Sequence, residues 1–334
     1  MSELYPLFFS PVLKHYLWGG RNLEKLGREL PSDLQVAESW EIASHSDGRT
    51  VVSNGHYAGK NLAELLTLLG EDLVGSNNLW ALERGVFPLL VKLLDAKTRL
   101  SIQVHPDDTY ACEHEGGNEL GKAEMWVILS ATPGAGIIYG FSQETTPEVF
   151  RQAIQAETLD PLLNFLPVKA GDHVCVPPGT LHAILDGVLL AEIQQNSNTT
   201  YRVYDWGRLD NQGRARALHV DRALDVLNFQ QVNEQLPISK TIEDSPQLLR
   251  ETLCLNAYFV VERLTFKQAA KYQGFCDGTT MEIWGVIQGC AEIHRDKMAR
   301  VKFCLLPAGL GEFTFQVKEN SQLLRIYTKE AIQN

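Results

Sequence analysis

The fold of this chain is decided by the stretch Gly171-Asp172-His173-Val174-Cys175-Val176-Pro177-Pro178-Gly179-Thr180-Leu181-His182. Its alternating apolar residues predict a strand. The prolines and Gly179 then predict a sharp turn, because proline fixes one backbone dihedral and glycine tolerates unusual ones. The turn presents His182 in a set direction. Taken alone, the segment is equally compatible with a hairpin whose histidine is exposed to solvent.

Short apolar segments bounded by glycine and proline recur along the chain and predict a mainly β protein. These strand-like segments are residues 87–94, 99–104, 124–129, 135–140, 173–176, 187–194 and 200–204. Apolar residues at helical spacing interrupt them at residues 61–69, 146–166 and 220–227. We therefore expect β-barrels with helical insertions.

The composition excludes several classes of partner. The 334 residues carry a net charge of -11, and no basic stripe with interleaved aromatics is present, so nucleic acid is not expected as a partner. No apolar run approaches the roughly 20 residues of a membrane span. An acidic protein can still bind a small anion, but only at a site made locally positive by a metal or by a few Lys and Arg side chains.

The cysteines and the N-terminus predict a compartment. Six cysteines are scattered without a C-x-x-C pair, which is typical of reduced, mostly buried thiols rather than a disulfide framework. Residues 1–20 lack the basic start and the apolar run of a signal peptide. We therefore predict a cytoplasmic protein whose metal, if it binds one, is held by nitrogen and oxygen ligands. The oligomeric state stays open.

Three further polar residues accompany His182 on predicted strands or beside them. Gln103 and His105 alternate along one segment and project from the same face, about 6–7 Å apart. Glu124 lies among apolar residues, and a buried carboxylate needs a counter-charge. Separately, His105 could cap a turn and Glu124 could pair with Lys122. Together the two histidines and the carboxylate form a ligand set that suits catalytic Zn²⁺ or non-haem Fe²⁺.

The remaining histidines have no such neighbours, and we predict structural or solvent-exposed roles for them. They are His15, His45, His56, His114, His173, His219 and His294.

Four segments in this order resemble the type I mannose-6-phosphate isomerases (phosphomannose isomerases) in their short bacterial form. They are LSIQVHPDD (residues 100–108), GKAEMW (121–126), PPGTLHAI (177–184) and AEIQQNSNTTYRVYDWGR (191–208). The resemblance extends from about Pro11 to the end, and the glycine-to-histidine spacing quoted first resembles the second motif of the cupin superfamily. It implies cupin-type jelly-roll barrels and one Zn²⁺ per chain.

The second half of the chain is expected to repeat the first. Residues 282–287 (EIWGVI) resemble residues 124–129 (EMWVIL), and a polar stretch, LPISKTIEDSPQ, separates the halves at residues 236–247. We therefore expect two jelly-roll domains, at residues 1–235 and 236–334. Chance similarity of short strands is the alternative. Glu312 aligns with His182, so the second domain is expected to lack a metal site.

The resemblance also implies roles for individual residues. His105, Glu124 and His182 correspond to the zinc ligands, with Gln103 as a candidate fourth. Arg202 corresponds to the active-site arginine of the family. Lys122 and Glu192 correspond to polar groups that line the cavity. Ser101 and Lys92 correspond to positions that hold the phosphorylated sugar. Ile184 stands where longer members have a tyrosine, which leaves the sugar contacts there undecided.

This site suits the interconversion of mannose 6-phosphate and fructose 6-phosphate. The reaction removes a proton beside a carbonyl, passes through an enediolate and returns the proton one carbon away. We predict Glu192 as the proton shuttle, with its pKa raised by burial, and Lys122, with its pKa lowered, as the alternative. Glu192 could instead support a zinc-bound histidine or Arg202, and Lys92 could be an ordinary strand-end lysine.

Two other functions fit the same ligand set. Two histidines and one carboxylate also describe an Fe(II)-dependent cupin oxygenase. A non-catalytic sugar-binding cupin is the third reading, because folds are retained when functions change.

Overall fold

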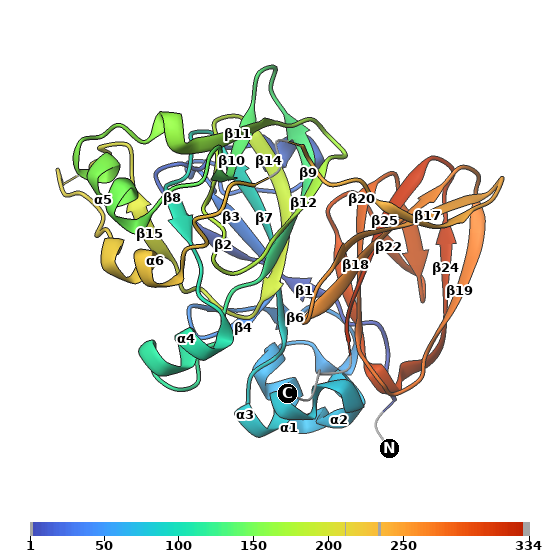
Figure 1. Cartoon of the computed structure of the whole chain (residues 1–334). Coiled ribbons are helices and arrows are strands. Elements are labelled where there is room, and N and C mark those ends of the chain that lie inside the picture. Colours follow the sequence, from blue (N-terminus) through green and yellow to red (C-terminus); the bar gives the residue numbers. More distant parts are fainter. Residues whose placement is uncertain (1–2, 211, 233–234, 330–334) are drawn as a thin grey trace.

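The computed structural model describes residues 3–210, 212–232 and 235–329, which form two pairs of β-sheets (Figure 1). In the first pair a six-stranded sheet packs against a five-stranded sheet. The six-stranded sheet has the order β12 (His173–Val176), β9 (Glu124–Ala131), β14 (Val188–Gln195), β7 (Leu89–Ala96), β3 (Glu38–Ile42) and β2 (Val12–Lys14). The five-stranded sheet has the order β11 (Leu163–Pro167), β10 (Gly136–Phe141), β13 (His182–Ile184), β8 (Ile102–Val104) and β15 (Tyr201–Tyr204).

The second pair repeats part of this strand order. Its six-stranded sheet runs β16 (Lys240–Asp244), β17 (Leu248–Leu255), β18 (Phe259–Phe266), β25 (Ser321–Thr328), β20 (Glu282–Gln288) and β23 (Phe303–Leu306). Its four-stranded sheet runs β19 (Ala270–Cys276), β24 (Gly311–Val317), β21 (Ala291–Ile293) and β22 (Asp296–Met298). The order β23-β20-β25-β18 matches β12-β9-β14-β7, which supports an internal duplication.

Short strands and helices connect the sheets. The two-residue strands are β1 (Phe9–Ser10), β4 (Ser44–His45), β5 (Gly48–Arg49) and β6 (Val51–Val52). The helices are α1 (Leu62–Leu69), α2 (Glu71–Val74), α3 (Leu79–Arg84), α4 (Asp108–His114), α5 (Pro147–Gln155) and α6 (Val220–Val226). Helices α1, α2 and α3 gather at one end of the molecule (Figure 1). None of the helices in the described residues is long and apolar enough to span a bilayer.

The mainly β prediction is confirmed, and each predicted strand overlaps a strand of the first sheet pair. The helix expected over residues 146–166 is wrong in its second half. Helix α5 ends at Gln155, and residues 163–167 form edge strand β11, paired with β10. A proline follows Asp160, and proline cannot supply the N–H that a continuing helix requires.

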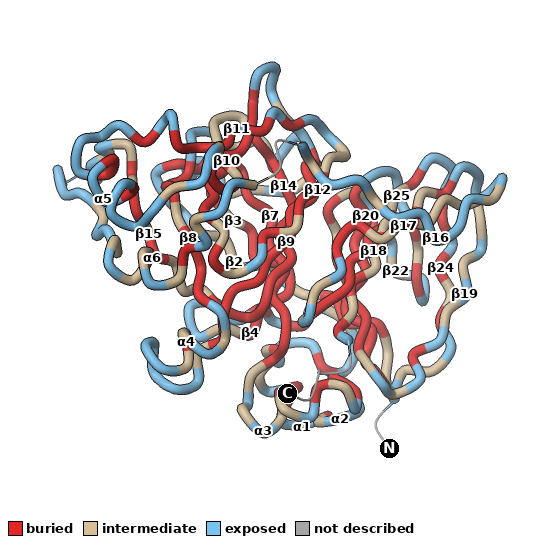
Figure 2. Tube along the Cα trace, in the orientation of Figure 1, coloured by how far each residue is buried: buried red, intermediate tan, exposed pale blue. Residues whose placement is uncertain are grey.

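Strands β7, β9 and β14 are buried on both faces and position the site (Figure 2). Side chains on one face, such as Val91, Met125 and Ile193, join a core that also contains residues of the second sheet pair. Side chains alternate along a strand. The opposite face therefore turns Lys92 and Glu192 into the first barrel.

The interior of the second barrel is filled by aromatic side chains. Trp284, Phe313 and Phe315 are buried in one cluster. Glu312, which aligns with His182, is exposed. Among the described residues, a group able to hold a metal occurs in the first barrel only.

The expectation of reduced cysteines is wrong for two positions. Cys175 of β12 and Cys254 of β17 form a disulfide between strands of the two six-stranded sheets. Cys290 is exposed. The pairing joins residues 79 positions apart, and no spacing in the sequence announces such a contact.

Candidate metal centre and substrate pocket

Three predicted ligand residues converge from separate parts of the first barrel. His105 follows β8, Glu124 begins β9 and His182 begins β13. Their ligand atoms lie within 4.8 Å of one another, and all three residues are buried. Nε2 of His105 lies 3.5 Å from Glu124 Oε2, and Nε2 of His182 lies 3.4 Å from Glu124 Oε1. The three residues could hold one metal ion.

Backbone carbonyls fix both imidazoles in the form that binds metals. Nδ1 of His105 donates to Thr199 O at 2.8 Å, and Nδ1 of His182 donates to Thr180 O at 2.9 Å. A carbonyl only accepts, so Nδ1 carries the proton and Nε2 keeps its lone pair. Burial lowers the pKa of His182 to about 4 and places the pKa of His105 well below its usual value. Both rings are therefore neutral ligands at pH 7.

The Glu124 carboxylate has an unsatisfied oxygen. Oε1 is buried and has no hydrogen-bond partner. Burial, together with the charge of Glu192, raises the pKa of this carboxyl to about 7 against the opposing effect of Lys122. A buried oxygen without a donor is costly unless a cation contacts it. The donor set of two imidazole nitrogens and one carboxylate oxygen fits a divalent ion.

Gln103 lies beside the three ligands. Its Nε2 is 3.3 Å from Nε2 of His182, and its Oε1 accepts from the Ser101 hydroxyl at 3.2 Å. Rotation of the amide by half a turn would point the oxygen at the ligand group, and the two amide orientations differ only in hydrogen bonding.

Lys122 is a buried cation in contact with two of the ligands. Its Nζ lies 3.1 Å from Nε2 of His105 and forms an ion pair with Glu124. Burial lowers its pKa, but the charges of Glu124 and Glu192 outweigh burial, so the pKa is raised. The expected lowering assumes a neighbouring zinc ion and Arg202, and it stays a prediction for the metal-bound protein.

Glu192 is held as a carboxylate between two lysines. Its Oε1 lies 3.6 Å from Lys92 Nζ and 3.7 Å from Lys122 Nζ, and its Oε2 accepts from Trp126 Nε1 at 3.2 Å. Burial raises its pKa, but the charges of Lys122 and Lys92 outweigh burial and the pKa is lowered. The expected raised pKa is therefore wrong. Lys92 also pairs with Glu38 at 3.7 Å.

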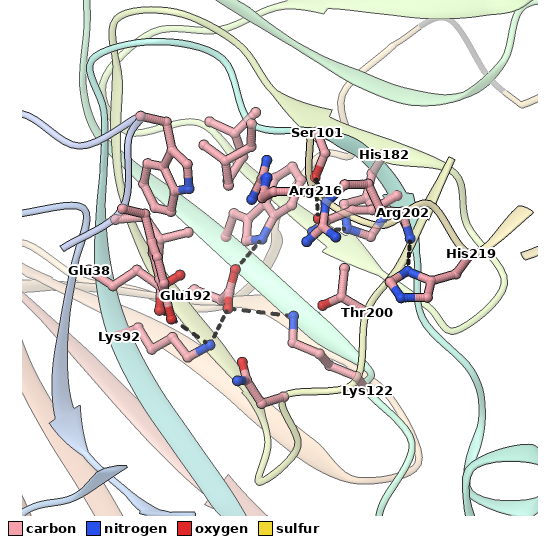
Figure 3. A pocket seen from close by; sticks show the side chains of 18 residues that line it. Glu38, Lys92, Ser101, Lys122, His182, Glu192, Thr200, Arg202, Arg216 and His219 are labelled. Carbon is pink, nitrogen blue, oxygen red and sulfur yellow. Dashed lines mark hydrogen bonds and ion pairs between the residues drawn. The ribbon is translucent and has the colours of Figure 1, made fainter. Parts of the chain in front are cut away.

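A cavity of about 340 Å³ opens in front of these residues (Figure 3). Its wall includes seven of the predicted site residues, namely Lys92, Ser101, Gln103, Lys122, His182, Glu192 and Arg202. His105 and Glu124 contact Lys122 and His182 at its floor. Arg202 donates from Nε to the Ser101 hydroxyl at 3.2 Å. The structure thus brings every predicted site residue to one place, and Ile184 lines the same cavity.

The sequence did not reveal several residues of the cavity wall. They are Tyr16, Glu38, Asn198, Thr200, Arg216 and His219. His219, for which a structural or solvent-exposed role is predicted, lines the cavity, and its Nδ1 accepts the backbone N–H of Arg202 at 3.3 Å. Arg216 and His219 follow a polar loop without any motif, so no local signal could have assigned them.

The paired β-sheets and a candidate metal centre inside the first barrel define a cupin-type protein. A family model described as the catalytic domain of type I phosphomannose isomerase matches residues 7–131. A mannose-6-phosphate isomerase from Bacillus subtilis is 39% identical over 320 residues, which cover 93% of this chain and 96% of the relative. The chain belongs to the type I mannose-6-phosphate isomerase family.

Two more comparisons agree with this assignment. A mannose-6-phosphate isomerase from Streptococcus mutans is 48% identical over 225 residues, which cover 67% of this chain and 68% of that protein. The crystal structure of the mannose 6-phosphate isomerase from Bacillus subtilis superposes with a TM-score of 0.84 at 34% identity, over 96% of this chain and 99% of the other. The predicted family and the cupin-type fold are confirmed.

Proposed function

We propose that this chain interconverts mannose 6-phosphate and fructose 6-phosphate with one Zn²⁺ bound by His105, Glu124 and His182. The observation that carries the proposal is the convergence of two neutral imidazoles and a carboxylate at the floor of a polar cavity. The names of its relatives support the choice of substrate.

The free lone pairs and the unsatisfied Glu124 oxygen fit a metal ion. Two imidazole nitrogens and one carboxylate oxygen suit Zn²⁺ as well as Fe²⁺, and the family resemblance leads us to choose Zn²⁺, with Gln103 as a candidate fourth ligand. When bound, the ion would supply Lewis-acid polarisation of the substrate oxygens. Lys122 now contacts the same lone pairs of His105 and Glu124. Lys122 must therefore give up these contacts when an ion binds. Its Nζ lies 3.7 Å from Glu192 Oε1, which can then pair with the ammonium.

Glu192 is the residue that we assign to proton transfer. Its lowered pKa keeps it ionised at neutral pH, so it can accept the proton from C2 of the aldose and return it to C1 after the enediolate forms. The flanking Lys92 and Lys122 hold the carboxylate in place. We assign Lys122 as a hydrogen-bond donor to substrate oxygens, because its Nζ lies 3.7 Å from Glu192 Oε1 in the same cavity, and Lys122 as the base is the alternative.

Arg202 and Ser101 bind the substrate from the opposite wall. The guanidinium is fixed by the Ser101 hydroxyl at 3.2 Å and by Ala217 O at 3.0 Å. A fixed cation in a partly buried cavity stabilises the negative charge that develops on the enediolate oxygens. We expect Lys92 to contact the sugar hydroxyls, since Glu38 and Glu192 already compensate its charge.

A coupled assay with mannose 6-phosphate tests the proposal directly. Protein purified without added metal is first analysed for its metal content and then reconstituted with Zn²⁺. Stoichiometric zinc and turnover support the proposal. Stoichiometric iron with oxygen uptake would assign an oxygenase instead, and inactivity of the zinc-loaded protein would leave sugar binding as the function. The cytoplasmic location stays a prediction.

A further inference from the structure

The loop at residues 197–200 connects the candidate metal centre to the cavity. Its Thr199 carbonyl accepts from His105 Nδ1 at 2.8 Å, and Thr200 lines the cavity (Figure 3). The loop lies between β14 and β15, outside any strand or helix. Because no ladder of backbone hydrogen bonds holds Thr199, side-chain contacts must fix the carbonyl that orients His105.

The carbonyl that holds the other histidine of the metal centre is fixed by its own backbone. Thr180 O accepts from His182 Nδ1 at 2.9 Å, and Thr180 lies in the turn before β13. In this turn Thr180 N donates to Pro177 O at 3.2 Å, and Gly179 N donates to His105 O at 2.9 Å. The acceptor of His182 is therefore held without help from side chains, whereas the acceptor of His105 is not.

Glu119, between α4 and β9, supplies the support that the loop lacks. Its Oε1 accepts from the Ser197 hydroxyl at 2.9 Å and from the Thr199 hydroxyl at 3.2 Å. The Ser197 hydroxyl oxygen in turn accepts from Thr199 N at 3.3 Å. One carboxylate oxygen therefore holds Thr199 in two ways, directly and through Ser197.

The hairpin of β4 and β5 holds the same loop from its other side. His45 places Nε2 3.8 Å from Glu119 Oε1, and its Nδ1 accepts from Asp47 N at 3.1 Å, so the ring proton lies on Nε2. Asp47 Oδ2 accepts from Asn198 Nδ2 at 2.7 Å. Two carboxylates thus fix neighbouring residues of the loop.

Glu119 is ionised, although only 25% of its side chain is exposed. Burial raises its pKa, but the hydrogen bonds from His45, Ser197 and Thr199 outweigh burial, so the pKa is lowered. A charged acceptor forms stronger hydrogen bonds with hydroxyl groups than a neutral acceptor does. The carboxylate is therefore a firm anchor for the loop.

We propose that Glu119 is a positioning residue for the metal centre, and that it acts through Ser197 and Thr199 to orient His105 and so raises the affinity for the metal ion. The choice of Zn²⁺ as that ion rests on the proposed function. The chain of contacts from Glu119 to His105 does not. Removal of a partner that orients a metal-binding histidine typically lowers metal affinity roughly 10–100-fold.

The zinc affinity of Glu119→Ala, measured by competition with a chromophoric chelator, tests the proposal. It should fall roughly 10–100-fold relative to the wild type. The titration is made at a temperature at which circular dichroism shows both metal-free proteins to be folded. A lowered Tm with an unchanged zinc affinity would assign Glu119 a role in stability alone and would overturn the proposal.

Glu115→Ala is the matched control. Glu115 directly follows α4, and its Oε1 accepts from the Tyr201 hydroxyl at 2.8 Å. In the described part of the chain it forms no hydrogen bond with residues 197–200, so its removal deletes a carboxylate acceptor without releasing the loop. Zinc affinity should stay within about 3-fold of the wild type. A loss equal to that of Glu119→Ala would overturn the proposal.

A double variant shows whether Glu119 acts through Thr199. Thr199→Val keeps the backbone carbonyl and removes the hydroxyl that bonds to Glu119. Glu119→Ala combined with Thr199→Val should bind Zn²⁺ about as well as Glu119→Ala alone, because the contact is already broken, and full additivity of the two losses would overturn the proposal. If Glu119→Ala fails to fold, Glu119→Gln carries the same tests with a loss of about 3–10-fold, since its amide oxygen accepts but has no charge.

Failure of the proposed function gives a different result. A wild type that binds Zn²⁺ but does not convert mannose 6-phosphate would reject the isomerase assignment and leave the role of Glu119 in place. If the wild type binds Fe²⁺ instead of Zn²⁺, the same variants are compared with Fe²⁺, and an unchanged affinity in Glu119→Ala would again overturn the proposal.

Discussion

Replacement of Glu192 by glutamine tests the assignment of the proton acceptor. The amide keeps the volume and can still accept from Trp126 Nε1, but it cannot accept a proton from carbon. General acid–base catalysis contributes about 10²–10⁴-fold, so kcat should fall by that factor, about 3–5 kcal/mol. The fold should survive, because Lys92 keeps Glu38 and Lys122 keeps Glu124. We expect a stability loss of only ~1–2 kcal/mol.

Two measurements on Glu192→Gln decide the matter. Steady-state kinetics with mannose 6-phosphate gives kcat and KM, and NMR in deuterated buffer follows exchange of the C2 proton. Glu38→Gln is the matched control, because it removes the other carboxylate beside Lys92 and should lower kcat less than about 10-fold. A Glu192→Gln variant that retains more than about a tenth of kcat, with C2 exchange intact, would show that another group moves the proton.

Three further predictions concern the metal, the Asp205 carboxylate and the disulfide. Chelation of the metal should abolish turnover and lower Tm, because an ion that binds only the folded state stabilises that state. In a thermal melt, Glu124→Ala should show the same low Tm with and without zinc. Burial raises the pKa of Asp205, but the hydrogen bonds from Arg216 and Arg208 outweigh burial, so the pKa is lowered. The ionised carboxylate therefore stabilises the fold above about pH 4, and this stabilisation is lost as the pH falls through the lowered pKa. Asp205→Asn should lower the free energy of unfolding above about pH 4 and should make it depend less on pH during acidification. Urea titration from pH 3 to 7 checks this, and parallel pH curves for the two proteins would contradict it. Cys175→Ser should lower the free energy of unfolding by about 2–5 kcal/mol in urea titrations without a reductant, and it should have no effect when a reductant is present. Peptide mapping that finds both thiols free would contradict this prediction.

Much of the fold and the ligand set could be predicted from local sequence. Alternating apolar residues gave the strands, and the Pro-Pro-Gly turn placed His182 at the start of β13. The helix at residues 62–69 begins where Asn61 and Glu64 form a capping box, which is a local signal. Motif resemblance then connected His105, Glu124 and His182 into one site.

Predictions that depended on charge environments failed. The pKa direction expected for Glu192 was reversed, because Glu192 of β14 faces Lys92 of β7 and Lys122, which precedes β9. His219 and Arg216 were missed because a loop after β15 folds back beside Arg202. Residues 163–167 became a strand because β10 offered an edge to pair with.

The sequence by itself determined which residues form strands and turns, because backbone preference and side-chain alternation act over a few neighbouring residues. Only the tertiary structure decided which charges meet, which loop completes the cavity wall and which cysteines pair. Those contacts join residues tens of positions apart, and they depend on strand register and sheet packing, which no short stretch of sequence encodes.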